Sequence, residues 1–279
     1  PRYIKARYNI ENTKEFSGKV SFAEPHYNLA SVYLDLGRLD DAEKEYGTAL
    51  VLKPDYYSAE LGMGSVKNKK GQYNLAIGHF LNSIDLMRKA TGQSDYAIAR
   101  LNLGEIYGKT RRFDQAITEL KRAIQAEPTM TAAHFNLGTA YMFIGANDKA
   151  ENSFKTCLNL NPNHEPALFN LAQVYQKKNF WDKSNNILEK FLKIKGPNPA
   201  AYSAIALNNM MAEKFQQAKI FYEKALDLIP NHQVALVNLA RIHYRLGKKE
   251  ISLSYVERAL KLNLSKIQAN EMEKLLKKL

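Results

Sequence analysis

The feature that most constrains the fold is a phrase that recurs at an interval of 34 residues. FNLGTAY begins at Phe135 and FNLAQVY begins at Phe169, and related versions occur along most of the 279-residue chain. A fixed period of this length indicates stacked supersecondary units, because one such unit cannot bury its own apolar face. Seven copies, numbered 1 to 7 below, start near Ala23, Tyr57, Ala97, Thr131, Glu165, Pro199 and Gln233.

Each copy has the pattern of two short amphipathic helices joined by a tight turn. Its seventh residue is a large aliphatic, its eighth is Ala or Gly, and its twentieth is Ala or Ser. Small side chains at these positions allow the two helices to cross closely. Most copies place a residue that tolerates a left-handed backbone between the helices: Gly37, Gly71, Gly145, Asn179 and Gly247. We therefore predict an all-α solenoid without β-structure.

These residues resemble the tetratricopeptide repeat, whose 34-residue pattern consists of an aromatic, Leu-Gly, Tyr, and then Ala, Phe and Pro. The resemblance extends from about Ala23 to Leu264. It implies a right-handed superhelical solenoid of seven helix-turn-helix repeats, with the first helix of each repeat on the concave side. The chain departs from the pattern where other residues replace the first aromatic or the Tyr: His26, Arg100, His134, Lys67, Asn209 and His243.

The two ends of the chain differ from the copies. Residues 1–22 do not fit an eighth copy, and we assign them no structure. Residues 23–264 form the repeat array, and residues 265–279 are expected to form a helix that caps copy 7. One stripe of this helix is apolar and lysines lie opposite: Ile267, Met272, Leu275, Leu276 and Leu279. Since the chain opens with Pro1, we expect a fragment of a longer protein.

Six extra residues separate copies 2 and 3, within the stretch LMRKATGQSDY. We expect the preceding helix to continue to about Lys89 and to end at Gly92, with Ser94 or Asp95 capping the next helix. One interpretation is a longer connection, which costs little free energy. The other is an overhanging helix that shapes a binding surface.

The sequence contains no signature of an enzyme, a metal site or a membrane span. Phosphate-binding loops, dinucleotide-binding motifs, zinc-binding helices and nucleophile elbows are all missing. Cys157 is the single cysteine, so no intrachain disulfide forms, and it replaces an alanine of other copies. Four further histidines are scattered, with no evident carboxylate partner: His79, His164, His232 and His243. We predict no catalytic residue, no cofactor and no metal ligand.

The formal net charge of +12 invites a nucleic-acid interpretation, but the charge is concentrated at the ends. Residues 241–279 hold ten Lys and Arg against four Asp and Glu, and residues 1–22 hold five against two. The 218 residues between them hold 25 against 22. Nucleic-acid binding is therefore disfavoured, and a basic end would suit an acidic partner or an anionic surface.

Asparagine recurs at the sixth position of the copies, which the resemblance places in the concave groove. We call these residues the asparagine row: Asn28, Asn102, Asn136, Asn170 and Asn238. A carboxamide offers a donor and an acceptor together, so a row of them suits the backbone of an extended peptide. The row resembles the asparagine ladder of the repeat domain of O-linked N-acetylglucosamine transferase. Alternatively, asparagine only completes the repeat phrase and bonds neighbouring helices.

Other groove positions carry aromatic, basic and apolar side chains. The fifth residues include Tyr27, Phe135 and Phe169, and basic residues follow two turns later at Lys69, Lys109, Lys177 and Arg245. An apolar stretch comprises Met142, Phe143, Met210 and Met211. A ligand with spaced acidic and apolar side chains would match this groove. A clamp for a terminal dicarboxylate is disfavoured, because its basic positions are occupied by residues such as Ala132, Phe135 and Asn136.

Two functions from different classes follow. The first is a protein-interaction scaffold or adaptor whose concave groove binds an extended peptide or a partner helix. The second is the substrate-presenting arm of a larger enzyme, such as a glycosyltransferase. A membrane would be reached only through a segment outside this sequence, and the residues leave the partner and the compartment open.

Overall fold

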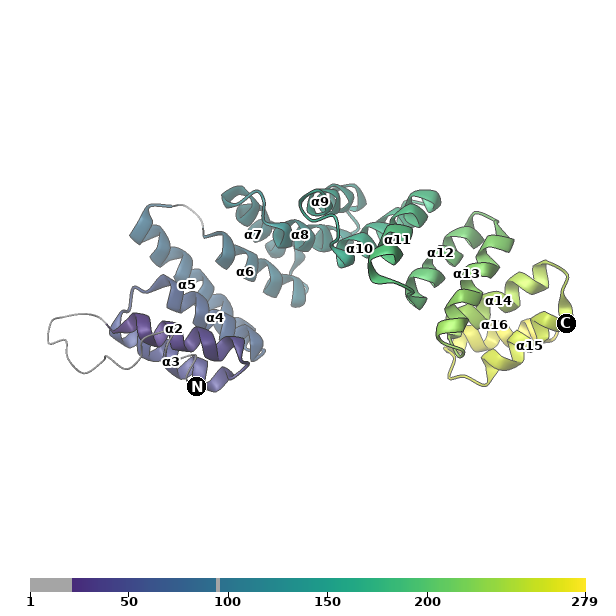
Figure 1. Cartoon of the computed structure of the whole chain (residues 1–279), viewed down its shortest axis with the longest axis horizontal. Helices are drawn as coiled ribbons and strands as arrows, with labels where there is room; N and C mark the ends of the chain where they lie inside the picture. Colours follow the sequence, from purple (N-terminus) through teal and green to yellow (C-terminus); the bar gives the residue numbers. More distant parts are fainter. Residues whose placement is uncertain (1–21, 94–95) are drawn as a thin grey trace. The chain divides into compact units, whose positions relative to one another are not determined.

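The computed structural model describes residues 22–93 and 96–279, and within those ranges every regular element is a helix. The expected all-α class is confirmed, and the helices follow one another as helix-turn-helix pairs (Figure 1). Of the described helices, none is long and apolar enough to cross a bilayer. The expectation for the N-terminal extension falls almost wholly on residues 1–21, which lie outside the described ranges.

The chain divides into two compact units. Unit 1 ends at Ile144 and unit 2 begins at Gly145. The helices of unit 1 are α2 (Ala23–Asp35), α3 (Leu39–Leu52), α4 (Tyr57–Lys69), α5 (Tyr73–Thr91), α6 (Ala97–Lys109), α7 (Phe113–Ala126) and α8 (Thr131–Phe143). Those of unit 2 are α9 (Asn147–Leu160), α10 (Glu165–Lys177), α11 (Trp181–Lys195), α12 (Pro199–Met211), α13 (Phe215–Leu228), α14 (Gln233–Arg245), α15 (Lys249–Leu260) and α16 (Lys266–Leu276).

A left-handed residue ends the turn after every first helix. Each first helix spans 13 residues, and the fifteenth residue of each copy has a positive φ between 57° and 76°. Glycine supplies this conformation in four copies, as the sequence predicts. Arg111, Asn179 and Glu213 adopt it in the other three, at a cost of about 1–2 kcal/mol for a residue with a Cβ atom. Repeat geometry therefore overrides local preference in copies 3 and 6.

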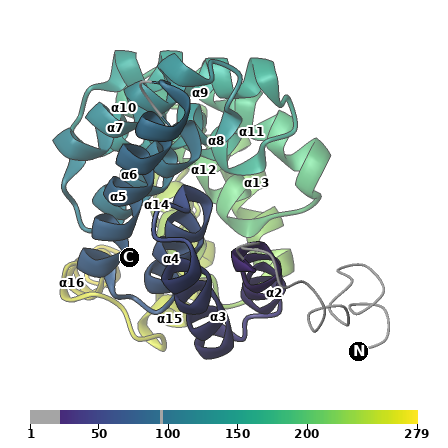
Figure 2. The same cartoon turned by 90° about the vertical axis from the view of Figure 1, so that its left-hand side faces the viewer.

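Within unit 1, glycines allow the two helices of a copy to cross at close range. A Cβ atom added to Gly64 would lie 2.6 Å from the Phe80 ring, and one added to Gly104 would lie 2.5 Å from Leu120. Phe80 and Leu120 are themselves fully buried. The first helices α2, α4, α6 and α8 also contact one another in succession, and Figure 2 faces the end of the unit that holds α2, α3 and α4. The first helices thereby form one continuous face.

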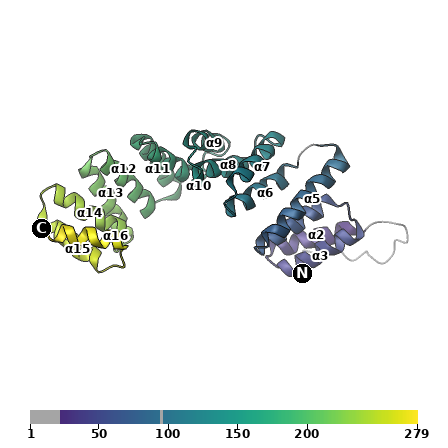
Figure 3. The ribbon, with the colours of Figure 1, turned by 180° about the vertical axis from the view of Figure 1, so that it is seen from behind.

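Unit 2 ends in helix α16, which packs against α14 and α15 (Figure 3). Ser265 caps its start in a reciprocal arrangement with Gln268, a motif that satisfies two free N–H groups. Met272 and Leu275 are buried, whereas Ile267 is 74% exposed. The predicted apolar stripe is thus wrong at Ile267 and at Leu276, which is 40% exposed. Five helical residues rotate the side chain of Ile267 well away from Met272, and Leu276 faces a different direction from Leu275, which it directly follows.

Helix α5 extends beyond its expected end. It runs two residues past Lys89 to Thr91, and Gly92 then ends it with a φ of +72°. The predicted stop at Gly92 is confirmed, because glycine adopts the left-handed conformation without steric cost. The proposed caps Ser94 and Asp95 lie outside the described residues, and Tyr96 immediately precedes α6.

Candidate functional site

Four members of the asparagine row share one environment. Asn28, Asn102, Asn136 and Asn170 lie on the first helices α2, α6, α8 and α10, and each is half-buried. Among the described residues, none donates a hydrogen bond to these four carboxamides or accepts one from them. Four polar groups on first helices are therefore open to an external partner.

The fifth member, Asn238 on α14, is different. It is only 5% exposed, and its Nδ2 atom donates to the Tyr222 hydroxyl at 3.0 Å. Its Oδ1 atom accepts from Arg241 at 3.0 Å. Both ends of this carboxamide are used inside the protein, so Asn238 acts as a structural residue that joins α13 and α14.

The difference between these asparagines follows from the preceding copy. Tyr222 is the twenty-fourth residue of copy 6, and the sixth residue of the next copy points at it. Gly62 shows the same direction, because an added Cβ atom would lie 2.3 Å from the ring of Tyr46. Three of the open asparagines follow another copy, and there the equivalent residue has no hydroxyl: it is Phe80 before Asn102, Leu120 before Asn136 and Phe154 before Asn170.

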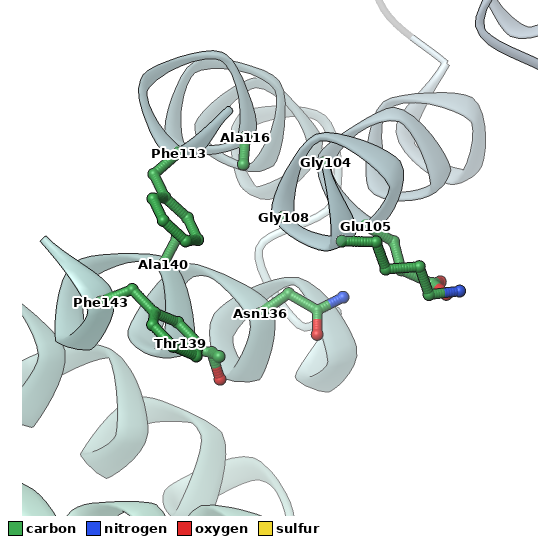
Figure 4. Close-up of a pocket in the computed structure, with 10 residues that line it drawn as sticks. Gly104, Glu105, Gly108, Phe113, Ala116, Asn136, Thr139, Ala140 and Phe143 are labelled. Atoms are coloured by element: carbon green, nitrogen blue, oxygen red, sulfur yellow. The ribbon is translucent and has the colours of Figure 1, made fainter. Parts of the chain in front are cut away.

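Beside Asn136 lies a cavity of about 330 Å³ that we call the apolar pocket (Figure 4). Helices α6, α7 and α8 form it, all within unit 1. The rings of Phe113 and Phe143 stack on one side, with centroids 5.1 Å apart and planes inclined by 8°. The opposite wall is the Gly104 and Gly108 face of α6. The other lining residues are Glu105, Lys109, Ala116, Asn136, Thr139 and Ala140.

This pocket exists because copy 3 lacks a side chain at its twelfth position. A Cβ atom added to Gly108 would meet no heavy atom within 4 Å. In all other copies the twelfth residue is larger: Leu34, Asn68, Met142, Gln176, Met210 and Tyr244. Small residues at Ala116 and Ala140 widen the same space. The sequence therefore contained the signal for this site, in a glycine that neither the turn nor the helix crossing requires.

The charged residues at the apolar pocket neutralise each other. Lys109 pairs with Glu105 at 2.5 Å, and both side chains are more than a third exposed. Glu105 points away from the phenylalanine rings (Figure 4). Thr139 Oγ1 donates to the Phe135 carbonyl at 3.0 Å, which satisfies the hydroxyl within its own helix. The carboxamide of Asn136 is thus the one uncharged polar side chain in the lining that is without a partner.

Unit 2 contains a second cavity, of about 400 Å³, that we call the arginine pocket. Met210 and Met211 of α12 and Phe215 of α13 line one part of it. Arg245 places its guanidinium over the Phe215 ring at 5.4 Å, and Arg241 binds Glu271 of α16. The remaining lining residues are Glu213 and Ile242.

The structure brings together some of the predicted groove residues and separates others. Asn136, Lys109 and Phe143 meet at the apolar pocket, and Met210, Met211 and Arg245 meet at the arginine pocket. Others contribute to packing or lie elsewhere. Tyr27 packs on Tyr46 and Tyr56, Phe169 packs on Phe191, Met142 is buried, Lys69 donates to the Leu34 carbonyl, Phe135 is half-buried and Lys177 is exposed.

The expectation that His79 has no carboxylate partner is wrong. Its Nδ1 atom lies 2.6 Å from Glu60, and in copy 1 His26 lies 2.6 Å from Glu45 in the equivalent place. In copy 3 Arg100 and Glu119 form the corresponding pair at 2.6 Å. The fourth and twenty-third residues thus form a histidine–carboxylate hydrogen bond in copies 1 and 2 and an ion pair in copy 3, in place of an aromatic contact. Sequence inspection missed these pairs because 19 residues separate the partners.

Reactive and metal-binding groups are not gathered in the described part of the chain. No three His, Cys, Asp or Glu side chains approach closely enough there to hold a metal ion. Cys157 is fully buried, and this burial raises the pKa of its thiol to about 11. At neutral pH the thiol is therefore protonated, and it packs as a small apolar side chain.

Comparison with known sequences identifies one family over most of the chain. Profiles described as tetratricopeptide repeat match residues 55–126, 23–56, 109–156, 234–263 and 200–232. The human protein named tetratricopeptide repeat protein 13 is 30% identical over 101 residues, which cover 36% of this chain and 12% of that protein. The chain thus matches about an eighth of this relative's length.

Solved structures share the fold at low sequence identity. The C-terminal part of a TPR repeat-containing protein from Cytophaga hutchinsonii aligns with a TM-score of 0.74 at 14% identity, over 88% of this chain and 98% of that one. PilF from Pseudomonas aeruginosa aligns with a TM-score of 0.64 at 18% identity, over 76% and 94%. YrrB, a TPR protein with an unusual peptide-binding site, aligns with a TM-score of 0.54 at 23% identity, over 75% and 97%.

Proposed function

The chain belongs to the tetratricopeptide repeat family, and from this premise we propose that it is an interaction scaffold whose first-helix face binds an extended peptide. The observation that carries the proposal is the set of four half-buried carboxamides without an internal partner. Asparagine is a mediocre helix former, so its recurrence in these helices needs a compensating role. A carboxamide supplies that role, because it donates to one peptide group and accepts from another.

The contrast with Asn238 supports a ligand-binding role for the other four. Where the preceding copy offers a hydroxyl, the asparagine uses it and is buried. Where the preceding copy offers Phe80, Leu120 or Phe154, no such partner exists. A peptide backbone lying along α6 and α8 of unit 1 would satisfy the carboxamides of Asn102 and Asn136 without selecting the side chains of the ligand.

The test uses a library of random twelve-residue peptides displayed on phage and selected against the wild-type chain. Synthetic versions of the enriched peptides are then titrated against a variant with Asn102 and Asn136 both replaced by Ala. Two lost hydrogen bonds of about 0.5–1.5 kcal/mol each predict a roughly five- to 150-fold weaker affinity. The melting temperature should hold or rise, because Ala favours the helix.

A matched variant replaces Asn152 and Asn159 by Ala. These two residues are exposed on the second helix α9, and their replacement should leave peptide affinity unchanged. If the library yields no binding peptide, or if the first variant loses stability but keeps its affinity, the asparagine row is architecture and the proposal is wrong.

A further inference from the structure

We propose that the apolar pocket receives one apolar side chain of the bound peptide, of the size of leucine, methionine or phenylalanine. This inference rests on the proposed function and adds a specificity that the asparagine row does not provide. Backbone contacts accept most sequences, whereas a pocket that one side chain must fill selects a single position of the ligand. The chain would therefore recognise a peptide by one anchor residue.

The walls of the pocket favour an apolar occupant. They consist of two stacked phenylalanine rings, two glycines and two alanines, with the Lys109–Glu105 pair turned outward. A charged side chain placed there would lose its water without gaining a counter-ion, because Lys109 and Glu105 already pair with each other. An apolar side chain would gain the free energy of leaving water, which is the main favourable contribution to such binding.

The size of the pocket and its polar edge indicate what carries this side chain. A volume of about 330 Å³ lies at the lower end of the range for sites that enclose a whole small-molecule ligand. The open carboxamide of Asn136 lies beside the cavity and offers a donor and an acceptor at once. A peptide unit matches that pair of groups, whereas a hydrocarbon chain has nothing to offer it. The occupant is therefore a side chain attached to peptide backbone.

Gly108 provides a substitution that fills the pocket without disturbing the fold. It lies within helix α6, and an added Cβ atom points into open space. Gly108→Leu should therefore occupy the cavity and keep or raise the melting temperature, since glycine is unfavourable inside a helix. Gly78, in helix α5, is exposed and also has open space around an added Cβ atom. Gly78→Leu is thus a matched control on a different surface.

The experiment selects random twelve-residue phage-displayed peptides on the wild-type chain and titrates the synthetic binders against both variants. We expect the enriched peptides to share one Leu, Met or Phe. Gly108→Leu should weaken their binding about ten- to a hundredfold, and Gly78→Leu should leave it unchanged. Replacing the shared residue of the peptide by Ala should weaken binding to the wild type as strongly, and should have little effect on Gly108→Leu.

The other outcomes separate this inference from the proposed function. If peptides are enriched without a shared apolar residue and bind Gly108→Leu as tightly as the wild type, the anchor is wrong and the scaffold stands. If no peptide is enriched, both are wrong. Should Gly108→Leu melt early, Phe143→Ala carries the test, because Phe143 is 59% exposed and its loss removes one wall. Unchanged affinity of a folded Phe143→Ala variant would also overturn the anchor.

Discussion

The apolar pocket of unit 1 and the arginine pocket of unit 2 occupy the same place in the repeat. Each is lined by the twelfth, thirteenth and seventeenth residues of one copy and by the ninth, tenth and thirteenth residues of the next. In copies 3 and 4 these include Gly108, Phe113 and Phe143, and in copies 6 and 7 they include Met210, Phe215 and Arg245. The seventeenth residue is phenylalanine in both pockets. Phe113 stacks on the ring of Phe143, whereas Phe215 lies under the guanidinium of Arg245.

The difference shows how a repeat scaffold separates the position of a pocket from its chemistry. Helix packing creates a space between successive first helices, and a few substitutions then decide what that space contains. In unit 2 it already contains an internal ion pair, because Glu271 of α16 binds Arg241. In unit 1 no such contact fills it, and the Gly108 side is left open.

The largest expected effect separates two glycines of one helix that line the same pocket. Gly104→Leu should lower the free energy of unfolding by about 3 kcal/mol, because overpacking a buried crossing forces neighbouring side chains off their rotamers. The clash is with Leu120, which is 1% exposed. Gly108→Leu, one turn later, should cost nothing. Urea unfolding of both variants measures the difference. Equal stabilities would show that Gly104 does not cross Leu120 as closely as the structure has it.

In unit 2, the buried side chain of His243 should destabilise helix α14, which carries both arginines of the arginine pocket. Both ring nitrogens are buried without a hydrogen-bond partner in the described structure, and the ring stacks on Tyr255. An unsatisfied buried polar group costs about 1–3 kcal/mol. His243→Phe should therefore raise the free energy of unfolding by that amount at pH 7. A denaturation midpoint that falls instead would reveal a bound water or partner at this histidine.

The same substitution should also change the response to pH. Burial lowers the pKa of His243, and Lys219 and Lys248 lower it further. The unfolded chain then binds a proton more readily, so stability decreases as the pH falls below the ordinary histidine value of 6.5. His243→Phe should reduce this slope. Part of it should remain, because burial also lowers the pKa of His232 at the start of α14.

A smaller effect compares the sixth residues of copies 4 and 7. Asn238→Ala removes bonds to Tyr222 and Arg241 and should cost about 1–2 kcal/mol of stability, since the buried Tyr222 hydroxyl loses its partner. Asn136→Ala removes no internal bond and should leave stability unchanged or slightly higher. Thermal unfolding of the two single variants provides the comparison. Equal losses would mean that Asn136 has a structural partner after all.

The smallest effect concerns an ion cluster that both units carry in equivalent places. In unit 1 Lys70 pairs with Asp40 and Glu43, and in unit 2 Lys178 pairs with Asp148 and Glu151. Burial raises the pKa of Glu151, but hydrogen bonds from Lys155 and Lys178 outweigh it and hold the value at about 2. The resulting stability is present at neutral pH and is lost as the pH falls from about 4.5 towards 2.

Lys70→Met and Lys178→Met should each lower stability at pH 7 only slightly, because solvent screens these exposed lysines. The two variants should also show a weaker loss of stability on acidification than the wild type. If the two variants behave alike, the repeat frameworks of the two units are equivalent and the units differ in their pockets. A large effect in only one unit would show that the repeat framework itself differs.

The helix pairs could be predicted from the sequence because packing recurs with a fixed period. A small eighth residue and a turn-forming fifteenth residue carry that information in almost every copy. The stop at Gly92 was predictable for the same local reason. Arg111 and Glu213 were not, since only the surrounding repeats hold those residues in a left-handed conformation.

The candidate site was less accessible to sequence reasoning. The asparagine row was visible as a pattern. The sequence did not show that Asn238 is bonded internally while the other four are open, because its partner Tyr222 lies in the preceding copy. The contacts of His26, His79 and Arg100 with carboxylates were hidden for the same reason. Gly108 was overlooked because a pocket is defined by the atoms that are missing, and the repeat pattern draws attention to the residues that recur.

The open space at Gly108 has a consequence for how this protein would vary between individuals and species. An inherited change of this glycine to alanine, leucine or methionine should leave a well-folded chain, since an added Cβ atom meets no obstacle and these residues favour the helix. Such an allele would escape the quality control that removes unstable proteins, and under the anchor proposal it would bind its ligand more weakly. The amount of the protein in the cell would then be unchanged, and only its binding to the partner would be reduced.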